Sequence, residues 1–272
     1  MNNIANISKK LEKKLKKLQN IIKSYQSVVI AFSGGVDSTF LSYICKKILG
    51  KENVLTVTAK SETFPSSEYK SAKKLAKKLN FKWMSIITEE LKIKNFQKNP
   101  LNRCYYCKFE LFKKLKKIAC EKNYKYVLEG SNYDDLKDYR PGMKAIKELD
   151  IKSPLKDAKL TKDEIIQLSK FYGLPTWNKP AFACLASRFP FNEYITIEKL
   201  KIIDKAENFL KKFKLSQIRV RYHKNLLRIE TNINDFDKIF LNRKKIVKKL
   251  KKLGFKFITL DLEGYRTGSM NP

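Results

Sequence analysis

The sequence has no long apolar run. No stretch approaches the roughly 20 apolar residues of a membrane-spanning helix, and the N-terminus lacks the apolar segment of a secretory signal peptide. These absences argue against a membrane protein. They predict a soluble protein of the cytoplasm, and the 43% hydrophobic content predicts a folded one.

Histidine is nearly absent, and cysteine is too scarce for a disulfide framework. Five cysteines, an odd number in 272 residues, suit a reducing compartment with reactive or metal-binding thiols. The single histidine, His223, lies in a predicted C-terminal strand and is interpreted as structural. A structural zinc site needs four protein ligands, and five cysteines with one histidine offer few combinations that could supply them.

Acidic residues are also scarce, because 27 Asp and Glu stand against 59 Lys and Arg, for a formal net charge of +32. Such a charge is typical of proteins that bind polyanions. The lysines, however, come in pairs spread along predicted helices, as at Lys9-Lys10 and Lys248-Lys249. This spread favours solvated helix faces, and nucleic-acid binding is the less favoured interpretation.

Apolar periodicity predicts an α/β fold. Predicted strands at 28–32, 54–59, 83–87 and 126–129 alternate with predicted helices of 10 or more residues, which indicates a doubly wound parallel sheet covered on both faces. Beyond residue 193 we expect a smaller α/β unit with a helix at 197–213, a hairpin, a helix at 235–253 and a last strand. The predicted domains are therefore 1–183 and 184–272, and the second is expected to bind substrate or to serve oligomerisation.

The stretch "VVIAFSGGVDS", Val28 to Ser38, places two glycines, two serines and a carboxylate at the end of the first predicted strand. Ligands bind at this position in doubly wound folds. Gly34 and Gly35 permit a left-handed turn and let an anion approach the backbone at a helix N-terminus. Ser33 and Ser38 add hydroxyl groups, and Asp37 is suited to capping the helix or to holding Mg²⁺.

This loop predicts a phosphate-binding site, although it is not a Walker A motif, because the Lys-Ser/Thr pair is missing. The bland alternative is a plain glycine turn. We favour the phosphate site because strand, glycines, acid, serine and helix follow one another in the required order.

Three cysteines carry the second candidate site. "NRCYYCK" holds Cys104 and Cys107 between two basic residues, just ahead of a predicted helix, where thiol pKa values fall. Cys184 lies in "ACLASR", between the two domains. Cys45 and Cys120 are interpreted as structural thiols. Three thiolates suit a 4Fe-4S cluster with one open iron; a sulfur-carrying Cys184 without a cluster, or a zinc or inert role, stays an alternative.

In the second domain, "QIRVRYH" places Arg219 and Arg221 on one face of a strand. Together with Arg188 they are candidates for binding the phosphate or carboxylates of a substrate, a task that suits arginine. The alternative is a pair of surface arginines.

At "SGGVDS" the sequence resembles the PP-loop ATP pyrophosphatase superfamily. The resemblance implies that ATP is cleaved between its α and β phosphates, so that a substrate is adenylylated and pyrophosphate is released. It also implies that Ala59, after the second strand, lies at the adenine. "EGSNYDD", with Gly130 and Asn132, is expected to form a ligand-facing loop.

Longer stretches, among them "EGSNYDDLKDYRPGMKA", "GLPTWNKPAFACLASRFP" and "DLEGYRTGSMN", are similar to the LarE family of ATP-dependent sulfur transferases over nearly the whole chain. That resemblance implies adenylylation of a carboxylate on pyridinium-3,5-biscarboxylic acid mononucleotide and sulfur insertion, in the biosynthesis of the nickel-pincer nucleotide cofactor.

The LarE resemblance also bears on the site residues and the partners. It implies that Cys104, Cys107 and Cys184 carry the cluster, that Glu207 and Glu230 line the substrate site or hold a metal, and that the protein forms a homo-oligomer. From the residues alone, a surface position is the commoner interpretation of either glutamate. A PP-loop tRNA thiolase, an amidotransferase-type synthetase and a non-enzymatic basic binding module remain alternatives.

Overall fold

The computed structural model describes residues 7–136, 141–266 and 268–270. Two compact units divide the chain. The first comprises residues 1–61, 68–89 and 102–181, and the second comprises residues 62–67, 90–101 and 182–272. The second unit therefore includes two short segments from the first half of the chain. The predicted roles of domains 1–183 and 184–272 stay a prediction.

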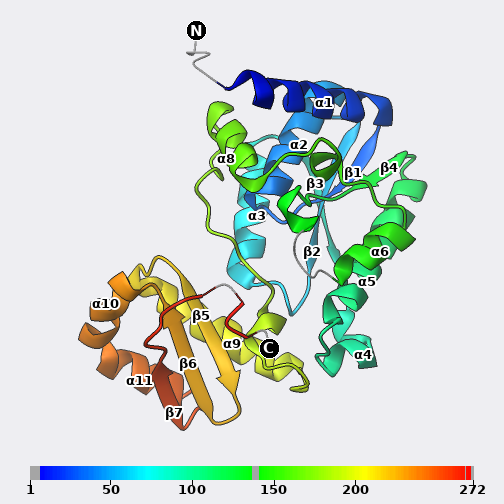
Figure 1. The fold of residues 1–272 in the computed structure, drawn as a ribbon. Coiled ribbons are helices and arrows are strands. Elements are labelled where there is room, and N and C mark those ends of the chain that lie inside the picture. Colours follow the sequence, from blue (N-terminus) through cyan, green and yellow to red (C-terminus); the bar gives the residue numbers. More distant parts are fainter. Residues whose placement is uncertain (1–6, 137–140, 267, 271–272) are drawn as a thin grey trace. The chain divides into compact units, whose positions relative to one another are not determined.

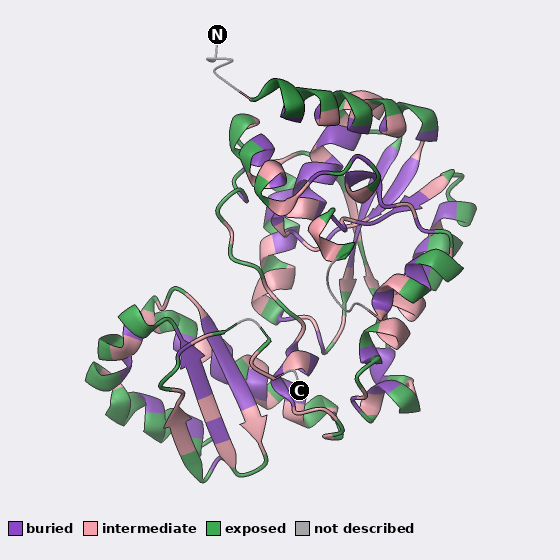
Figure 2. Ribbon diagram, in the orientation of Figure 1, coloured by how far each residue is buried: buried purple, intermediate pink, exposed green. Residues whose placement is uncertain are grey.

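The first unit is built on a four-stranded parallel sheet with the order β3-β2-β1-β4. The strands are β1 (Val28–Ala31), β2 (Val54–Lys60), β3 (Lys82–Ile87) and β4 (Tyr126–Leu128). β1 lies in the interior and is nearly free of solvent contact (Figure 2), as expected for an apolar strand covered on both faces. Because the strands are parallel, the loops that follow them share one edge of the sheet.

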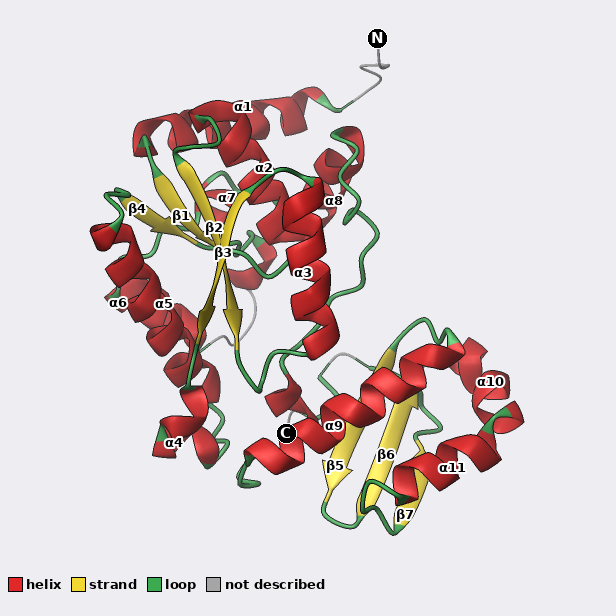
Figure 3. Ribbon diagram, turned by 180° about the vertical axis from the view of Figure 1, so that it is seen from behind, coloured by secondary structure: helices red, strands yellow, loops and turns green. Residues whose placement is uncertain are grey.

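Helices cover both faces of this sheet (Figures 1 and 3). Val28 and Ile30 of β1 pack with α1, α2, α7 and α8, whereas Val29, which points the opposite way, packs with α5 and α6. The helices of the first unit are α1 (Lys9–Tyr25), α2 (Val36–Leu49), α3 (Ser66–Lys78), α5 (Arg103–Glu121), η2 (Asp134–Leu136), α6 (Gly142–Glu148), α7 (Pro154–Asp157) and α8 (Lys162–Phe171). The predicted α/β fold with a parallel sheet is confirmed.

The second unit has a three-stranded mixed sheet with the order β5-β6-β7. β5 (Ile218–His223) and β6 (Leu226–Thr231) form the predicted antiparallel hairpin, and β7 (Phe257–Leu260) pairs parallel to β6. The helices α9, α10 and α11 lie over one face of the sheet (Figure 3). The helical segments of this unit are η1 (Glu90–Lys92), α4 (Lys94–Gln97), η3 (Leu185–Arg188), α9 (Ile197–Leu210), η4 (Lys211–Phe213), η5 (Ile233–Asp235), α10 (Phe236–Leu241) and α11 (Arg243–Lys251).

Three predicted features are corrected. Cys104 and Cys107 lie inside α5, which begins at Arg103, and not ahead of a helix. The predicted helix at 235–253 is two helices, because Asn242 ends α10 and precedes α11. Cys120 is exposed near the end of α5 and is no part of the core, whereas Cys45 is fully buried as expected. No helix among the described ranges has the length and apolarity to cross a bilayer.

Candidate active site

Ser33, Gly34 and Gly35, here called the SGG loop, form the turn between β1 and α2. Gly34 has φ +72°, and a Cβ there would lie 3.0 Å from the Cα and Cβ of Ala72 in α3. Gly35 is the N-cap of α2 and has no capping side chain. The backbone therefore passes so close to α3 that a side chain at Gly34 would both clash and strain the turn. This is the geometry that the sequence predicts for a loop that receives an anion at a helix N-terminus.

Hydroxyl groups and Asp37 occupy the start of α2. The Oγ atoms of Ser33 and Ser38 are 3.1 Å apart, and the Ser33 Oγ accepts a hydrogen bond from the Gly35 N–H. Asp37 accepts from Lys162 Nζ at 2.5 Å and from Asn132 Nδ2 at 3.4 Å. The structure thus brings together Asp37 and Asn132, which are 95 positions apart and were predicted to face one ligand.

The loop after β4 packs on the first turn of α2, which follows the SGG loop. A Cβ at Gly130 would be 3.2 Å from the backbone nitrogen of Ser38, so this position also needs a glycine or a small shift of the chain. Next to it, the buried Glu129 accepts hydrogen bonds from the hydroxyls of Ser131 at 2.7 Å and Ser153 at 2.5 Å. These bonds fix the loop that follows β4. Ala59 is the last residue but one of β2, at the carboxyl end of that strand and therefore at the same edge of the sheet, and its place at the adenine stays a prediction.

Two lysines at the loop were missed by the sequence analysis. Lys162 is the first residue of α8 and pairs with Asp37. Lys179 donates to the Gly34 carbonyl at 3.0 Å and forms an ion pair with Glu68 at 2.8 Å. Both lysines are distant from the loop in sequence, and nothing in the local pattern distinguishes them from the many solvated lysines.

Cys104 and Cys107 lie in the first turn of α5, three positions apart. Residues at that spacing share one face of a helix. Cys104 is exposed and Cys107 is half-buried, so both lie at the surface of the first unit. Such a pair of thiols fits two ligand positions of an iron–sulfur cluster.

Cys184 belongs to the second unit and is half-buried immediately before η3. Its segment is held on two sides. The Leu185 N–H donates to the Thr63 carbonyl at 2.7 Å, and Arg188 Nη1 donates to the carbonyls of Ala183 and Cys184, each at 3.2 Å. The backbone that carries the thiol is therefore fixed by bonds that leave the sulfur itself uninvolved.

Arg188 is almost fully buried and forms a forked ion pair with Glu207 of α9. Its Nε and Nη2 lie 2.7 and 3.1 Å from the two carboxylate oxygens. Glu207 also accepts from the Val220 N–H on the free edge of β5. Burial lowers the pKa of Arg188, but the charge of Glu207 outweighs burial and raises it. Glu207 is buried, so the surface interpretation of this residue is wrong.

Arg219 and Arg221 share one face of β5, as predicted, and both are buried. Arg221 donates to Glu230 at 2.7 Å, to the Ser269 hydroxyl at 2.8 Å and to the Ser187 carbonyl at 2.9 Å. Glu230 is fully buried, and Arg228 of the same strand pairs with it at 3.0 Å. The alternative interpretation of Arg219, Arg221 and Glu230 as surface residues is therefore wrong. One network joins these charged groups to the segment that carries Cys184.

The electrostatics of this network follow from burial and pairing. Burial raises the pKa of Glu230, but hydrogen bonds and charge from Arg221 outweigh it, so the carboxyl stays below its ordinary pKa. Arg219 has a lowered pKa because it is buried and close to Arg188. Its guanidinium carbon lies 5.1 Å from the centre of the Tyr265 ring. Arginines remain charged despite such shifts, and the carboxylates of Glu207, Glu230 and Asp261 offset most of the positive charge of the network.

No grouping of three or more His, Cys, Asp and Glu side chains with metal-binding geometry occurs in residues 7–136, 141–266 and 268–270. The predicted set Cys104, Cys107 and Cys184 is divided between the two units. Residues 137–140, 267 and 271, which belong to two of the family-like stretches, lie outside the described residues.

Comparison with known proteins agrees with this geometry. A family model described as NAD synthase matches residues 4–107. The pyridinium-3,5-bisthiocarboxylic acid mononucleotide synthase of Lactiplantibacillus plantarum is 35% identical over 253 residues, which cover 92% of this chain and 91% of that protein. The chain belongs to the LarE family.

Two further relatives extend across the same length. An uncharacterized protein of Synechocystis is 40% identical and covers 96% of this chain, and one of Methanocaldococcus jannaschii is 38% identical and covers 94%. The alignments with these relatives thus include both units. The NAD synthase match covers only residues 4–107, which contain the SGG loop.

Proposed function

We propose that the protein is an ATP-dependent sulfur transferase that adenylylates a carboxylate of pyridinium-3,5-biscarboxylic acid mononucleotide and replaces a carboxylate oxygen by sulfur. The observation that carries the proposal is the SGG loop at the start of α2, with Asp37 and Asn132 converging on it. The name of the Lactiplantibacillus relative supplies the class of product, a pyridinium-3,5-bisthiocarboxylic acid mononucleotide. The product belongs to the biosynthesis of a nickel-pincer nucleotide.

ATP phosphates bind the backbone of Ser33 to Ser38, where the helix N-terminus supplies partial positive charge. Asp37 would help to hold the Mg²⁺ that accompanies ATP. Lys162 and Lys179 lie beside the loop and offset the charge of the pyrophosphate as it separates. Adenine lies near Ala59, and Gly130 and Asn132 complete the wall of the site.

The reaction divides into two displacements. A carboxylate oxygen of the substrate attacks the α-phosphorus, the bond to the bridging oxygen of the β-phosphate breaks, and pyrophosphate leaves. The resulting mixed anhydride makes AMP the leaving group at the carboxyl carbon. A reduced sulfur nucleophile then forms the carbon–sulfur bond while AMP departs with its oxygen.

The second unit binds the substrate anions. Arg219 and Arg221 supply the positive charge, and Glu230 orients Arg221. Arg188 acts on the site through Glu207 and through the Cys184 carbonyl, because its donors are engaged within the protein. We therefore assign Arg188 and Glu207 a positioning role.

Cys104, Cys107 and Cys184 would hold a 4Fe-4S cluster, and such a cluster supplies a sulfide on its open iron when bound. The helical pair in α5 and the fixed backbone at Cys184 support this assignment. The competing source of sulfur is the thiol of Cys184 itself, which would be consumed in the reaction.

Substrate-dependent exchange of radiolabelled pyrophosphate into ATP tests the first displacement. We expect exchange only when pyridinium-3,5-biscarboxylic acid mononucleotide is present, and a loss of about 100-fold or more in Asp37→Asn, as for removal of one strong electrostatic group from such a site. Asp163→Asn is the matched control, because Asp163 is exposed on α8. Release of the terminal phosphate alone, or exchange equal in Asp37→Asn and wild type, would overturn the proposal.

A further inference from the structure

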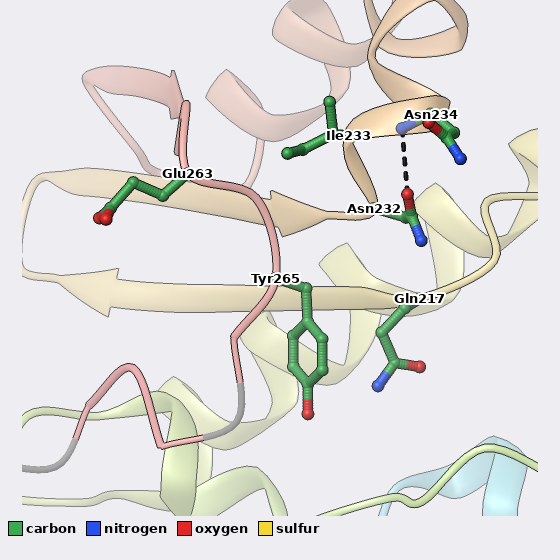
Figure 4. A pocket seen from close by; sticks show the side chains of 6 residues that line it. All are labelled: Gln217, Asn232, Ile233, Asn234, Glu263 and Tyr265. Atoms are coloured by element: carbon green, nitrogen blue, oxygen red, sulfur yellow. Dashed lines mark hydrogen bonds between the residues drawn. The ribbon is translucent and has the colours of Figure 1, made fainter.

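The second unit contains a pocket that the proposed function has not used. Its volume is about 380 Å³, and it lies where the end of β6 meets the C-terminal segment (Figure 4). This volume is within the range of small-molecule sites. The pocket is lined by Gln217, Asn232, Ile233, Asn234, Glu263 and Tyr265.

The walls of this pocket are fixed by specific bonds. The Tyr265 N–H donates to the Thr231 carbonyl at 2.9 Å, and the Thr231 hydroxyl donates to the Gln217 carbonyl at 2.6 Å. Gly264 has φ +73°, and a Cβ there would be 3.0 Å from Ile233 Cγ1. Only glycine allows the C-terminal segment to pass this close to β6. The pocket is thus held in shape before any ligand arrives.

Three carboxamides and one phenol ring face this space. Asn232 Oδ1 accepts the Asn234 N–H at 3.0 Å, which sets the orientation of that amide. The side-chain amides of Gln217 and Asn234 make no hydrogen bond within the described part of the chain. In Figure 4 the side chains of Gln217 and Tyr265 point in the same direction. Amide donors and acceptors beside an aromatic ring are suited to a planar, polar ring that carries hydrogen-bonding groups.

The charge of the pocket is unusual for this protein. The chain has 59 lysines and arginines, yet none of the six lining residues is basic and one, Glu263, is acidic. Glu263 forms an ion pair with Arg266 at 2.5 Å. Both side chains are largely exposed, so the arginine neutralises the carboxylate only weakly. A doubly charged phosphate group is therefore disfavoured at this place, whereas the lining suits a zwitterionic ring whose nitrogen is positive and whose carboxylates can accept hydrogen bonds from the amides.

The pocket shares a wall with the arginine network. The ring of Tyr265 lies against Arg219, which is buried beside Arg188. We propose that this pocket binds the pyridinium ring of the nucleotide substrate. The carboxamides donate to the ring carboxylates, and Tyr265 and Glu263 stabilise the ring cation. This assignment rests on the proposed function, since it specifies which part of that substrate the second unit recognises.

Calorimetric titration with pyridinium-3,5-biscarboxylic acid mononucleotide, in the absence of ATP, tests the assignment. We expect Gln217→Ala and Asn234→Ala each to weaken binding about tenfold, the loss expected for one good hydrogen bond. Tyr265→Leu should weaken it more. Asn225→Ala is the matched control, because Asn225 is an exposed amide in the β5–β6 turn and should leave the affinity unchanged.

Unchanged affinity in Gln217→Ala and Asn234→Ala, or equal losses in Asn225→Ala, would overturn the assignment, as would no binding to the wild type. Competition by AMP alone would assign the pocket to an adenine ring instead and would equally overturn it. Pyrophosphate exchange distinguishes the two proposals. If the variants keep substrate-dependent exchange at normal substrate affinity, the pocket assignment fails and the proposed function stands. If the wild type binds the substrate, the variants bind it more weakly and the wild type shows no exchange, the pocket assignment stands and the proposed function fails.

Discussion

Arg188 and Glu207 show how a buried charge is kept in this protein. Both side chains are nearly excluded from solvent, and all the nitrogens of Arg188 donate to the protein. A buried pair of this kind contributes little net stability relative to an apolar pair, but removal of one partner leaves an uncompensated charge. The pair instead fixes the backbone before η3, because Arg188 donates hydrogen bonds to the carbonyls of Ala183 and Cys184.

Arg188→Met should therefore lower the free energy of unfolding by about 3–5 kcal/mol, because Glu207 loses its partner in a dry environment. The double variant Arg188→Met, Glu207→Met should recover much of that loss. Urea unfolding measures both. A double variant less stable than the single one would contradict this account of the pair.

Glu230 gives a pH dependence with a definite sign. Its pKa is below the ordinary value in the folded state, so its contribution to stability is complete above the unfolded pKa of about 4.3 and is lost as the pH falls through the folded pKa. The stability difference between wild type and Glu230→Gln should be constant from pH 8 to about 5 and should shrink at lower pH. Urea unfolding at several pH values measures it. A difference that grows on acidification would refute the assignment.

For single residues, the sequence predicts which side chains share a face of an element better than it predicts which of them are buried. Alternation along "QIRVRYH" places Arg219 and Arg221 on one face without any tertiary knowledge. The burial of Glu207 and Glu230 is not predictable in the same way, because an isolated glutamate is usually a surface residue. Only their pairing with arginines from other segments makes burial tolerable.

Among the elements, the β1–α2 turn depends most on one residue type. Gly34→Ala should weaken ATP binding at least tenfold, because a Cβ would meet Ala72 at 3.0 Å and displace the loop. Gly50→Ala is the control: Gly50 also has a positive φ, +83°, but a Cβ there meets nothing within 4 Å. It should cost about 1–3 kcal/mol of stability and leave ATP affinity intact. Equal ATP affinity in both variants would show that the loop does not contact the nucleotide.

Element positions follow from periodicity where the helix has a clear apolar face or cap. Thr161 followed by Glu164 is the pattern of a capping box, and the structure has that capping box at the start of α8. The start of α5 was placed too late, since "NRCYYCK" contains no breaker and no apolar period that marks its boundary. The break at Asn242 is likewise invisible in a lysine-rich segment whose apolar residues continue on both sides.

For the whole molecule, the three candidate cluster ligands are supplied by both units. Iron and acid-labile sulfide in anaerobically purified protein should fall sharply in Cys104→Ala, Cys107→Ala and Cys184→Ala. Cys120→Ala, which removes an exposed thiol from the same helix as Cys104, should retain both. An iron-free wild type that loses the elements of hydrogen sulfide at Cys184 during turnover would instead identify a consumed cysteine.

Side-chain partners that are far apart in the sequence could not be predicted from it. Lys162 reaches Asp37 across 125 positions, and Lys179 reaches Gly34 across 145. Among so many lysines, no local pattern identifies these two. The turn between β1 and α2 was predictable because the residues that form it are consecutive, and phosphate binding there stays a prediction.

The most direct test of the whole account is the product balance of an anaerobic reaction with ATP and pyridinium-3,5-biscarboxylic acid mononucleotide, followed by mass spectrometry and nucleotide chromatography. The account predicts one AMP and one pyrophosphate for each carboxylate oxygen replaced by sulfur, and no thiocarboxylate from Cys184→Ala. ADP and phosphate as the nucleotide products, or undiminished thiocarboxylate from Cys184→Ala, would contradict it.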